Sequence, residues 1–185
     1  SIMKKFIAIA LFAFTALSTF GQVKYLTRTG HVSFFSDAAL EDIEAHNHQV
    51  TALLEASTGK LAYKIPIKSF EFDKALMQEH FNENYMQSDK FPEATFDGVI
   101  ADISKVNFNK SGTYVVTVTG KLTIHGITKD VSVTGEVIVD AAAKKVTTKA
   151  NFTIALVDYG IKNDKAQKIS DTIEIRVNTE MPIKK

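Results

Sequence analysis

Apolar and polar residues alternate along most of the chain from Gln22 onward. In residues 113–125 every second side chain is apolar or glycine, and those between are mostly threonine, lysine and histidine. A period of two places neighbouring side chains on opposite faces of a β-strand. The same alternation recurs in residues 131–139, 146–156 and 173–177. The pattern therefore predicts strands with one dry face and one face toward water.

Turn signals rich in glycine, serine and asparagine separate the alternating segments and indicate hairpins in sequence order. We expect about eight or nine strands, at residues 23–28, 31–44, 46–56, 60–72, 94–107, 112–125, 128–140, 145–158 and 171–181. In the fourth of these segments the apolar positions change parity near Lys68 and Ser69, which indicates a bulge or a bend. Consecutive long antiparallel strands close into an up-and-down barrel, which leaves no exposed edge, or otherwise form a sandwich. The favoured fold is all-β, an antiparallel eight-stranded β-barrel with its apolar face inward.

One segment, residues 74–86, departs from the strand pattern and has helical spacing. Asp73 precedes it and is the expected N-cap. Met77, Phe81 and Tyr85 recur every four residues on one side of this helix, and Leu76 and His80 lie on the adjoining stripe. A single amphipathic helix between two strands is suited to close one barrel mouth as a plug or lid. The alternative is a helix that packs on the outside as cover for the core.

The N-terminal segment has the features of a secretory signal in the usual order. A pair of lysines precedes an apolar stretch over residues 6–17, which is shorter than the roughly 20 residues that span a bilayer. Small residues follow and place cleavage after Gly21. We expect a signal peptide over residues 1–21 and a mature domain over residues 22–185, with an uncleaved membrane anchor as the alternative. Export of a protein without cysteine suits the bacterial periplasm.

Composition narrows the classes of function. Apolar residues make up 45% of the 185 residues and charged ones 23%, which is typical of a folded domain. The formal charge is +1, so no overall field attracts nucleic acid, and we expect no nucleic-acid partner. The chain has no cysteine, which excludes disulfides and thiolate catalysis.

Few residues suggest chemistry. His46 and His48 lie two apart, so their rings share a strand face and could bind a metal if a third ligand came from a neighbouring strand. That arrangement would support a metal-assisted enzyme, but the surroundings are polar, and we expect solvated histidines and no metal. His125 precedes a glycine and is expected at a surface turn. No nucleophile elbow, zinc-protease motif, P-loop or dinucleotide fingerprint is present in the sequence, so we predict no catalytic residues, no cofactor and no enzyme activity.

The inward rows suggest room inside the barrel. They hold many valines and isoleucines together with Gly120 and Gly135, and an eight-stranded barrel can either fill with its own side chains or hold one slender ligand. Phenylalanines gather near the helix and the strand ends. The candidate ligand-binding residues are Phe34, Tyr63, Ile65, Ile67, Phe70, Phe72, Leu76, Phe81, Tyr85, Phe91, Phe96, Val116, Val118, Leu122, Phe152, Ile154 and Leu156. We expect a long apolar ligand, and the alternative is a structural or interaction protein whose barrel is filled by its own phenylalanines.

Four segments in the same order resemble the motifs of the YceI-like family. They are residues 34–44, residues 90–96 (KFPEATF), residues 120–131 (GKLTIHGITKDV) and residues 158–161 (DYGI). The resemblance covers nearly the whole mature chain. It implies a lipocalin-like barrel of eight antiparallel strands in the periplasm that binds a polyisoprenoid, such as an isoprenoid quinone, without catalysis. The implied partner is an isoprenoid or other long-chain lipid, and a transient membrane contact and a homodimer both remain open.

Overall fold

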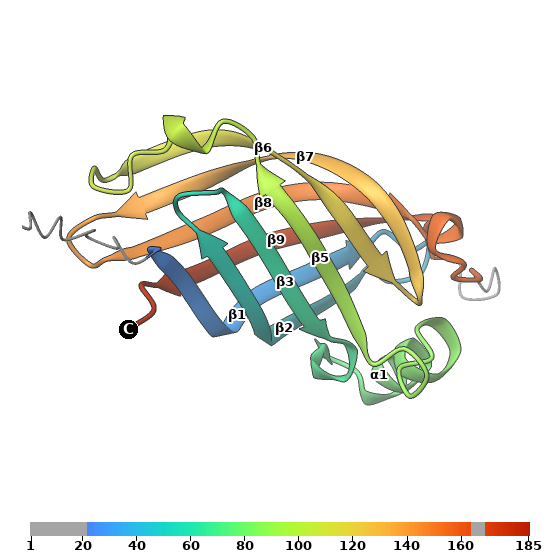
Figure 1. Cartoon of the computed structure of the whole chain (residues 1–185). Coiled ribbons are helices and arrows are strands. Elements are labelled where there is room, and N and C mark those ends of the chain that lie inside the picture. The colour runs from blue at the N-terminus through green and yellow to red at the C-terminus, as the bar shows by residue number, and fades with distance from the viewer. Residues whose placement is uncertain (1–21, 164–168) are drawn as a thin grey trace, which may run out of the picture.

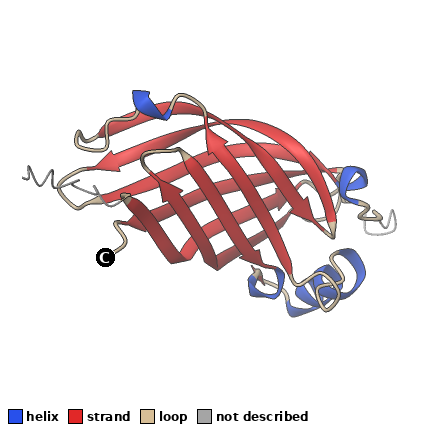
Figure 2. Cartoon of the chain, viewed as in Figure 1, coloured by secondary structure: helices blue, strands red, loops and turns tan. Residues whose placement is uncertain are grey.

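The computed structural model describes residues 22–163 and 169–185. The expected signal peptide over residues 1–21 lies outside the described residues. Figures 1 and 2 show a molecule built mostly of long curved strands, with helical turns gathered mainly at its ends. The long strands are β1 (Lys24–Ser36), β2 (Ile43–Glu55), β3 (Lys60–Pro66), β5 (Glu93–Ile100), β6 (Gly112–Ile124), β7 (Ile127–Asp140), β8 (Lys145–Ala155) and β9 (Thr172–Pro182). The short elements are β4 (Glu71–Phe72), the helix α1 (Ala75–His80), which continues as a π-helical turn (Phe81–Tyr85), and the 3-10 turns Ile67–Ser69, Ile103–Lys105 and Leu156–Tyr159.

The strands form one closed sheet. Their order is β1-β9-β8-β7-β6-β5-β3-β2, and β1 also pairs with β2, which joins the two ends of the sheet. Every pairing is antiparallel. The two-residue β4 adds to β2 outside this ring. The fold is the antiparallel eight-stranded barrel that the alternation of apolar residues predicts.

Several strand boundaries differ from the predicted ones. The segments 23–28 and 31–44 are not separate strands, because β1 runs without a break through two register shifts around Gly30 and ends at Ser36. The strand β5 ends at Ile100 rather than at residue 107, because Asp102 has a positive φ of 53° that turns the chain out of the ladder. The change of parity near Lys68 is a 3-10 turn, Ile67–Ser69, which separates β3 from β4.

The helix lies where the sequence predicts it, but Asp73 is not its N-cap. The capping position is Lys74, whose backbone is extended and whose side chain makes no capping hydrogen bond. The Lys74 ammonium instead pairs with Glu41, which lies in the loop between β1 and β2. The helix begins one residue later than expected, and this ion pair fixes its first turn to another loop.

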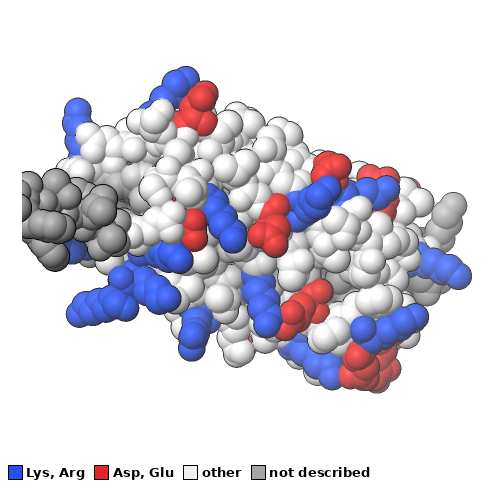
Figure 3. Space-filling model, viewed as in Figure 1, with Lys and Arg blue, Asp and Glu red and all other residues white. Residues whose placement is uncertain are grey.

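The interior of the barrel is mostly apolar. Along β7 and β8 the buried side chains follow the predicted parity, with Val137, Val139 and Val146 at most 3% exposed. No charged side chain is buried anywhere in residues 22–163 and 169–185. Figure 3 shows acidic and basic residues mixed over the visible face, without a field of one sign. Within the same residues no helix is long and apolar enough to cross a membrane.

Candidate functional site

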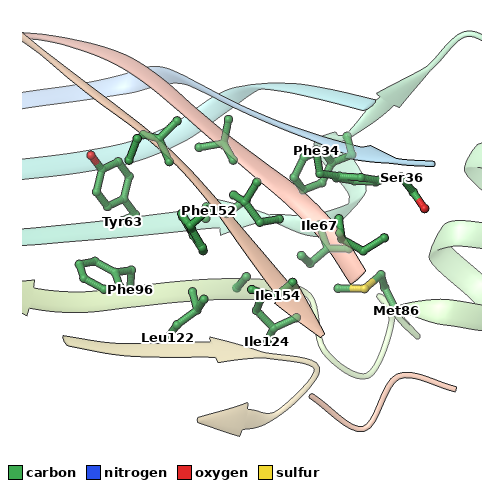
Figure 4. Close-up of a pocket in the computed structure, with 18 of the residues that line it drawn as sticks. Phe34, Ser36, Tyr63, Ile67, Met86, Phe96, Leu122, Ile124, Phe152 and Ile154 are labelled. Atoms are coloured by element: carbon green, nitrogen blue, oxygen red, sulfur yellow. The ribbon is translucent and has the colours of Figure 1, made fainter. Parts of the chain in front are cut away.

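The barrel encloses an apolar cavity of about 440 Å³. Side chains from all eight barrel strands line it, together with β4, α1 and the loops at the same end of the barrel. In Figure 4, Tyr63, Phe96, Leu122 and Phe152 from four different strands point toward one shared space. The volume lies within the roughly 300–1,000 Å³ that ligand pockets occupy. The barrel is therefore not filled by its own side chains.

The cavity follows the barrel lengthwise. On β6 its lining extends from Val116 to Ile124, a span of about 26 Å at about 3.3 Å per residue. Met86 and Ile67 lie at the end beside α1, and Tyr63 and Phe96 lie toward the other end (Figure 4). A long, narrow space of this kind suits a chain-like molecule better than a compact one.

Sixteen of the seventeen residues predicted as ligand-binding line this cavity. They are Phe34, Tyr63, Ile65, Ile67, Phe70, Phe72, Leu76, Phe81, Tyr85, Phe96, Val116, Val118, Leu122, Phe152, Ile154 and Leu156. Phe91 is the exception, because its ring packs edge-on against His125 at 4.7 Å and beside Gly126 in the turn between β6 and β7. Its side chain supports that turn and does not face the cavity.

The helix covers one end of the barrel, which we call the mouth. Five side chains of the helical segment, Leu76, Met77, His80, Phe81 and Tyr85, line the cavity, so this segment closes the mouth and is not an external cover. Figure 1 shows α1 at that end, beyond the start of β5. The apolar stripe that the sequence places on this helix is the face turned toward the cavity.

Four phenylalanines hold the helix to the mouth. Phe34 of β1, Phe70, Phe72 of β4 and Phe81 form the mouth cluster, with ring centroids 5.0–5.8 Å apart in five pairs. Most pairs are tilted or edge-on, the arrangements that aromatic rings prefer. Because all four rings also line the cavity, this cluster is both the seal of the mouth and part of the binding surface.

The mouth loops are tied to one another by polar contacts. The loop between β1 and β2 meets the loop before β9 through a bridge between Ala38 and Ile169. His125 lies in the turn between β6 and β7, as the sequence predicts, and it has a positive φ of 53°. Its Nδ1 donates to the carbonyl oxygen of Tyr159 at 3.1 Å, and its Nε2 lies 2.9 Å from the side-chain oxygen of Gln87.

Polar groups facing the cavity are few. The hydroxyls of Tyr63 and Thr148 share a hydrogen bond, and burial raises the pKa of Tyr63 to about 12. The Ser36 hydroxyl is different: its residue is 2% exposed, lines the cavity, and has no hydrogen-bond partner within the described parts of the chain. Such a buried hydroxyl costs free energy unless it gains a partner.

Sequence reasoning missed part of the lining. Ser36, Ile43, Ile161, Ile169, Ile173, Ile175 and Val177 line the cavity and were not among the predicted residues. The last three follow the period of two along β9 and could have been found from it. Ile161 and Ile169 lie in the loop between β8 and β9, where no periodicity marks the inward side chains.

His46 and His48 do not belong to this cavity. Both lie on β2 beside the buried residues Ala45 and Asn47, so the two histidines face away from the interior. Neither is among the lining residues. Their own surroundings are described below.

The fold and the site together define a closed antiparallel barrel that encloses an elongated apolar cavity under a helical lid. The chain belongs to the YceI-like family, since the model of the YceI-like domain matches residues 17–181. A comparison with curated proteins gives no significant match.

Solved structures share this fold. A polyisoprenoid-binding domain from Saccharophagus degradans, implicated in plant cell wall breakdown, is 13% identical with a TM-score of 0.76, and the match covers 89% of this chain and 100% of that one. BcnA from Burkholderia cenocepacia is 20% identical with a TM-score of 0.68, covering 82% and 95% of the two chains. The YCEI protein of Campylobacter jejuni is 20% identical with a TM-score of 0.61, covering 80% and 89%.

Proposed function

We propose that the protein is a non-catalytic periplasmic binding protein that sequesters or carries a long apolar lipid of the isoprenoid type inside its barrel. The observation that carries the proposal is the elongated apolar cavity of about 440 Å³ under the helix. A buried hollow lined by hydrocarbon gains free energy when hydrocarbon fills it.

In this proposal, the length of the ligand's hydrocarbon chain determines its affinity for the protein. Burial contributes about 0.8 kcal/mol per methylene, so a five-carbon prenyl unit contributes about 4 kcal/mol before the costs of association. Because no charged side chain is buried within the described residues, the part of the ligand inside the barrel must be uncharged. Affinity therefore rises with each prenyl unit until the cavity is full.

The polar end of the ligand belongs at the mouth. Ser36 is the last residue of β1, and its unpartnered hydroxyl lies at the helix end of the cavity (Figure 4). A ligand head group within reach of this hydroxyl would supply the missing hydrogen bond. His80, on the helix, also lines the cavity there. These two side chains are our candidates for contact with a hydroxyl or carbonyl head group.

The isoprenoid class rests on family membership. The chain matches the YceI-like domain, and one structure with the same fold is a polyisoprenoid-binding domain. The cavity itself favours any flexible apolar chain. An almost wholly apolar lining supplies little for proton transfer or nucleophilic attack, which supports binding rather than catalysis. The periplasmic location is supported by the lysine pair and short apolar stretch of the N-terminal sequence.

The mouth also suits contact with a lipid surface. Leu40 and Leu76 line its opening and are 80% and 64% exposed, although both are large apolar side chains. We place the exchange of lipid here, between a membrane and the cavity. Replacing both leucines by glutamate should slow transfer of a bound lipid to vesicles, whereas Val115→Glu, at a 72% exposed position on the barrel wall, should leave the transfer rate unchanged.

Mass spectrometry of an organic extract of the purified protein tests the proposed function. We expect a prenyl lipid in a fixed ratio to protein. Delipidated protein should bind geraniol, farnesol and geranylgeraniol with increasing affinity, and its melting temperature should rise with ligand concentration. Repeated absence of any prenyl or acyl lipid, together with no uptake of these alcohols, would overturn the proposal and favour a purely structural role. Cell fractionation tests the compartment separately.

A further inference from the structure

Three histidines meet on the outer wall of the barrel. His31 of β1 joins His46 and His48 of β2, and each offers a ring nitrogen within 4.8 Å of the others. We call these residues the histidine cluster. His31 and His46 are half-buried and His48 is exposed, and none of the three lines the lipid cavity. The histidine cluster is therefore a second candidate site, on the opposite face of the sheet from the lipid cavity.

A β-bulge brings His31 into the cluster. Gly30 pairs with Val50 and Val32 pairs with Asn47, so the single residue His31 lies opposite two residues of β2. These two are His48 and Gln49. A bulge of this kind changes the direction of side chains. It explains why the rings of His31 and His48 stack with their centroids only 4.4 Å apart.

Asn47 holds the bulge in place from the inner side. Its side chain is fully buried, its Oδ1 accepts a hydrogen bond from the Gln49 amide at 2.9 Å, and its Nδ2 donates to the Pro66 carbonyl at 2.8 Å. Because Asn47 lies between His46 and His48 in the chain, these bonds also fix the backbone that carries both rings. The cluster thus has a rigid base.

The nitrogens face one another at close range. Nε2 of His31 lies 2.8 Å from Nδ1 of His46. On its other side, Nε2 of His46 donates to Oε1 of Glu44 at 3.1 Å, so a neutral His46 has its lone pair on Nδ1, toward His31. A carboxylate that orients a histidine in this way is the usual support of a metal ligand.

The three ring nitrogens lie close enough together to bind one metal ion after small movements. Tetrahedral coordination with metal–nitrogen bonds of about 2.0–2.1 Å places the nitrogens about 3.3 Å apart. The rings stack at 8–13° to one another, so they must fan out to point at one ion. Rotation about the terminal side-chain torsion, which is soft in histidine, provides this movement.

The charged side chains around the histidine cluster do not oppose the binding of a cation. Arg176 lies nearby, with Nη1 3.7 Å from Glu44 Oε1, but it also pairs with Glu174, so two carboxylates accompany one guanidinium. Burial, followed by repulsion from His48 and then His46, lowers the pKa of His31. Histidine binds metals through its neutral form, which burial favours.

From this geometry we infer that the histidine cluster is a binding site for a divalent first-row transition metal. Three imidazole nitrogens suit Zn²⁺ and Cu²⁺, and Cu²⁺ binds nitrogen sites more tightly in the Irving–Williams order. Three protein ligands leave at least one coordination position for water or for a group from another molecule. The site joins β1 to β2 on the outside of the barrel, so a bound ion would also brace this strand pair.

Isothermal titration of the purified full chain with zinc chloride tests the inference. We expect one Zn²⁺ per chain, and at least a tenfold loss of affinity in each of His31→Gln, His46→Gln and His48→Gln. The matched control is His125→Asn, which removes a histidine from a turn outside the cluster and supplies a residue that tolerates the positive φ there. This control should bind Zn²⁺ like the unaltered chain.

Two further measurements exclude loss of folding as the cause of weaker binding. His48 is exposed, so His48→Gln should keep the circular dichroism spectrum and melting temperature of the unaltered metal-free protein. With Cu²⁺ as the probe, electron paramagnetic resonance should detect several coordinated nitrogens in the unaltered chain and fewer in the folded His48→Gln variant. The inference fails if Zn²⁺ binding is not saturable at one per chain, or if the three variants bind as well as His125→Asn.

Discussion

Filling the cavity from within is the most direct perturbation of lipid binding. Val118 of β6 and Val133 of β7 are directly opposite each other in the sheet, and both line the cavity. Replacing both by phenylalanine places two rings in the space that we assign to lipid. The new side chains are apolar and enter a hollow, so the barrel should fold with its stability kept or raised.

The expected size of the effect follows from the atoms displaced. Each Val→Phe change adds about four carbon atoms, which displace a similar number of ligand methylenes at about 0.8 kcal/mol each. A single variant should lose about 3 kcal/mol of binding, which is roughly a hundredfold in Kd. The double variant should lose about 6 kcal/mol, enough to weaken binding roughly ten-thousandfold.

The assay compares the amount of extracted lipid and the affinity for geranylgeraniol between variants. Val115→Phe is the control, because it makes the same substitution on β6 but at a side chain that is 72% exposed on the outer face. We expect the control to bind like the unaltered protein. If the folded double variant keeps its affinity, or if Val115→Phe loses as much, the lipid does not occupy this cavity.

Three further outcomes follow from single side chains. Burial raises the pKa of Tyr63 from 10.0 to about 12, so its contribution to stability is complete below pH 10 and lost as pH rises through about 12. Urea unfolding should detect a loss of about 3 kcal/mol over this range that Tyr63→Phe lacks. Phe91→Ala should cost about 1–3 kcal/mol of stability in the same assay and leave lipid affinity unchanged, because its ring lies outside the cavity. Gly120→Ala should lower the melting temperature markedly, since its new Cβ would collide with the Asp97 carbonyl, whereas Gly112→Ala meets nothing closer than 3.8 Å and should not.

The alternation of apolar and polar residues was sufficient to predict the barrel. In β6, β7 and β8 every strand is long, one face is buried, and a one-residue slip would expose the whole apolar row. Register and inward direction are therefore fixed by the sequence itself. The same logic selected Val116, Leu122 and Phe152, which line the cavity because they share the inward parity of their strands.

Features that depend on contacts between distant segments could not be predicted in this way. Phe91 was assigned to the cavity because it is aromatic, but its ring packs against His125 in the turn between β6 and β7. Aspartate is a residue type that favours the N-cap, so the sequence pointed to Asp73. Lys74 takes that position instead, and its side chain pairs with Glu41 in the loop between β1 and β2. Nothing in the sequence around His31 indicates that it belongs with His46 and His48. Only the bulge around Gly30 turns its ring toward His46.

The two proposed sites share strands but not faces, and this permits a test of their independence. On β1, Val32 lines the cavity while its neighbour His31 faces outward, and on β2 the buried Asn47 separates the outward His46 and His48. Because successive side chains point to opposite sides of the sheet, rings added to β6 and β7 cannot reach the histidine cluster. The Val118→Phe, Val133→Phe double variant should therefore bind Zn²⁺ with unchanged affinity while losing geranylgeraniol, and His48→Gln should show the reverse. A titration in which lipid loading changes the Zn²⁺ affinity more than about twofold would instead indicate that the β1–β2 bulge moves when the cavity fills.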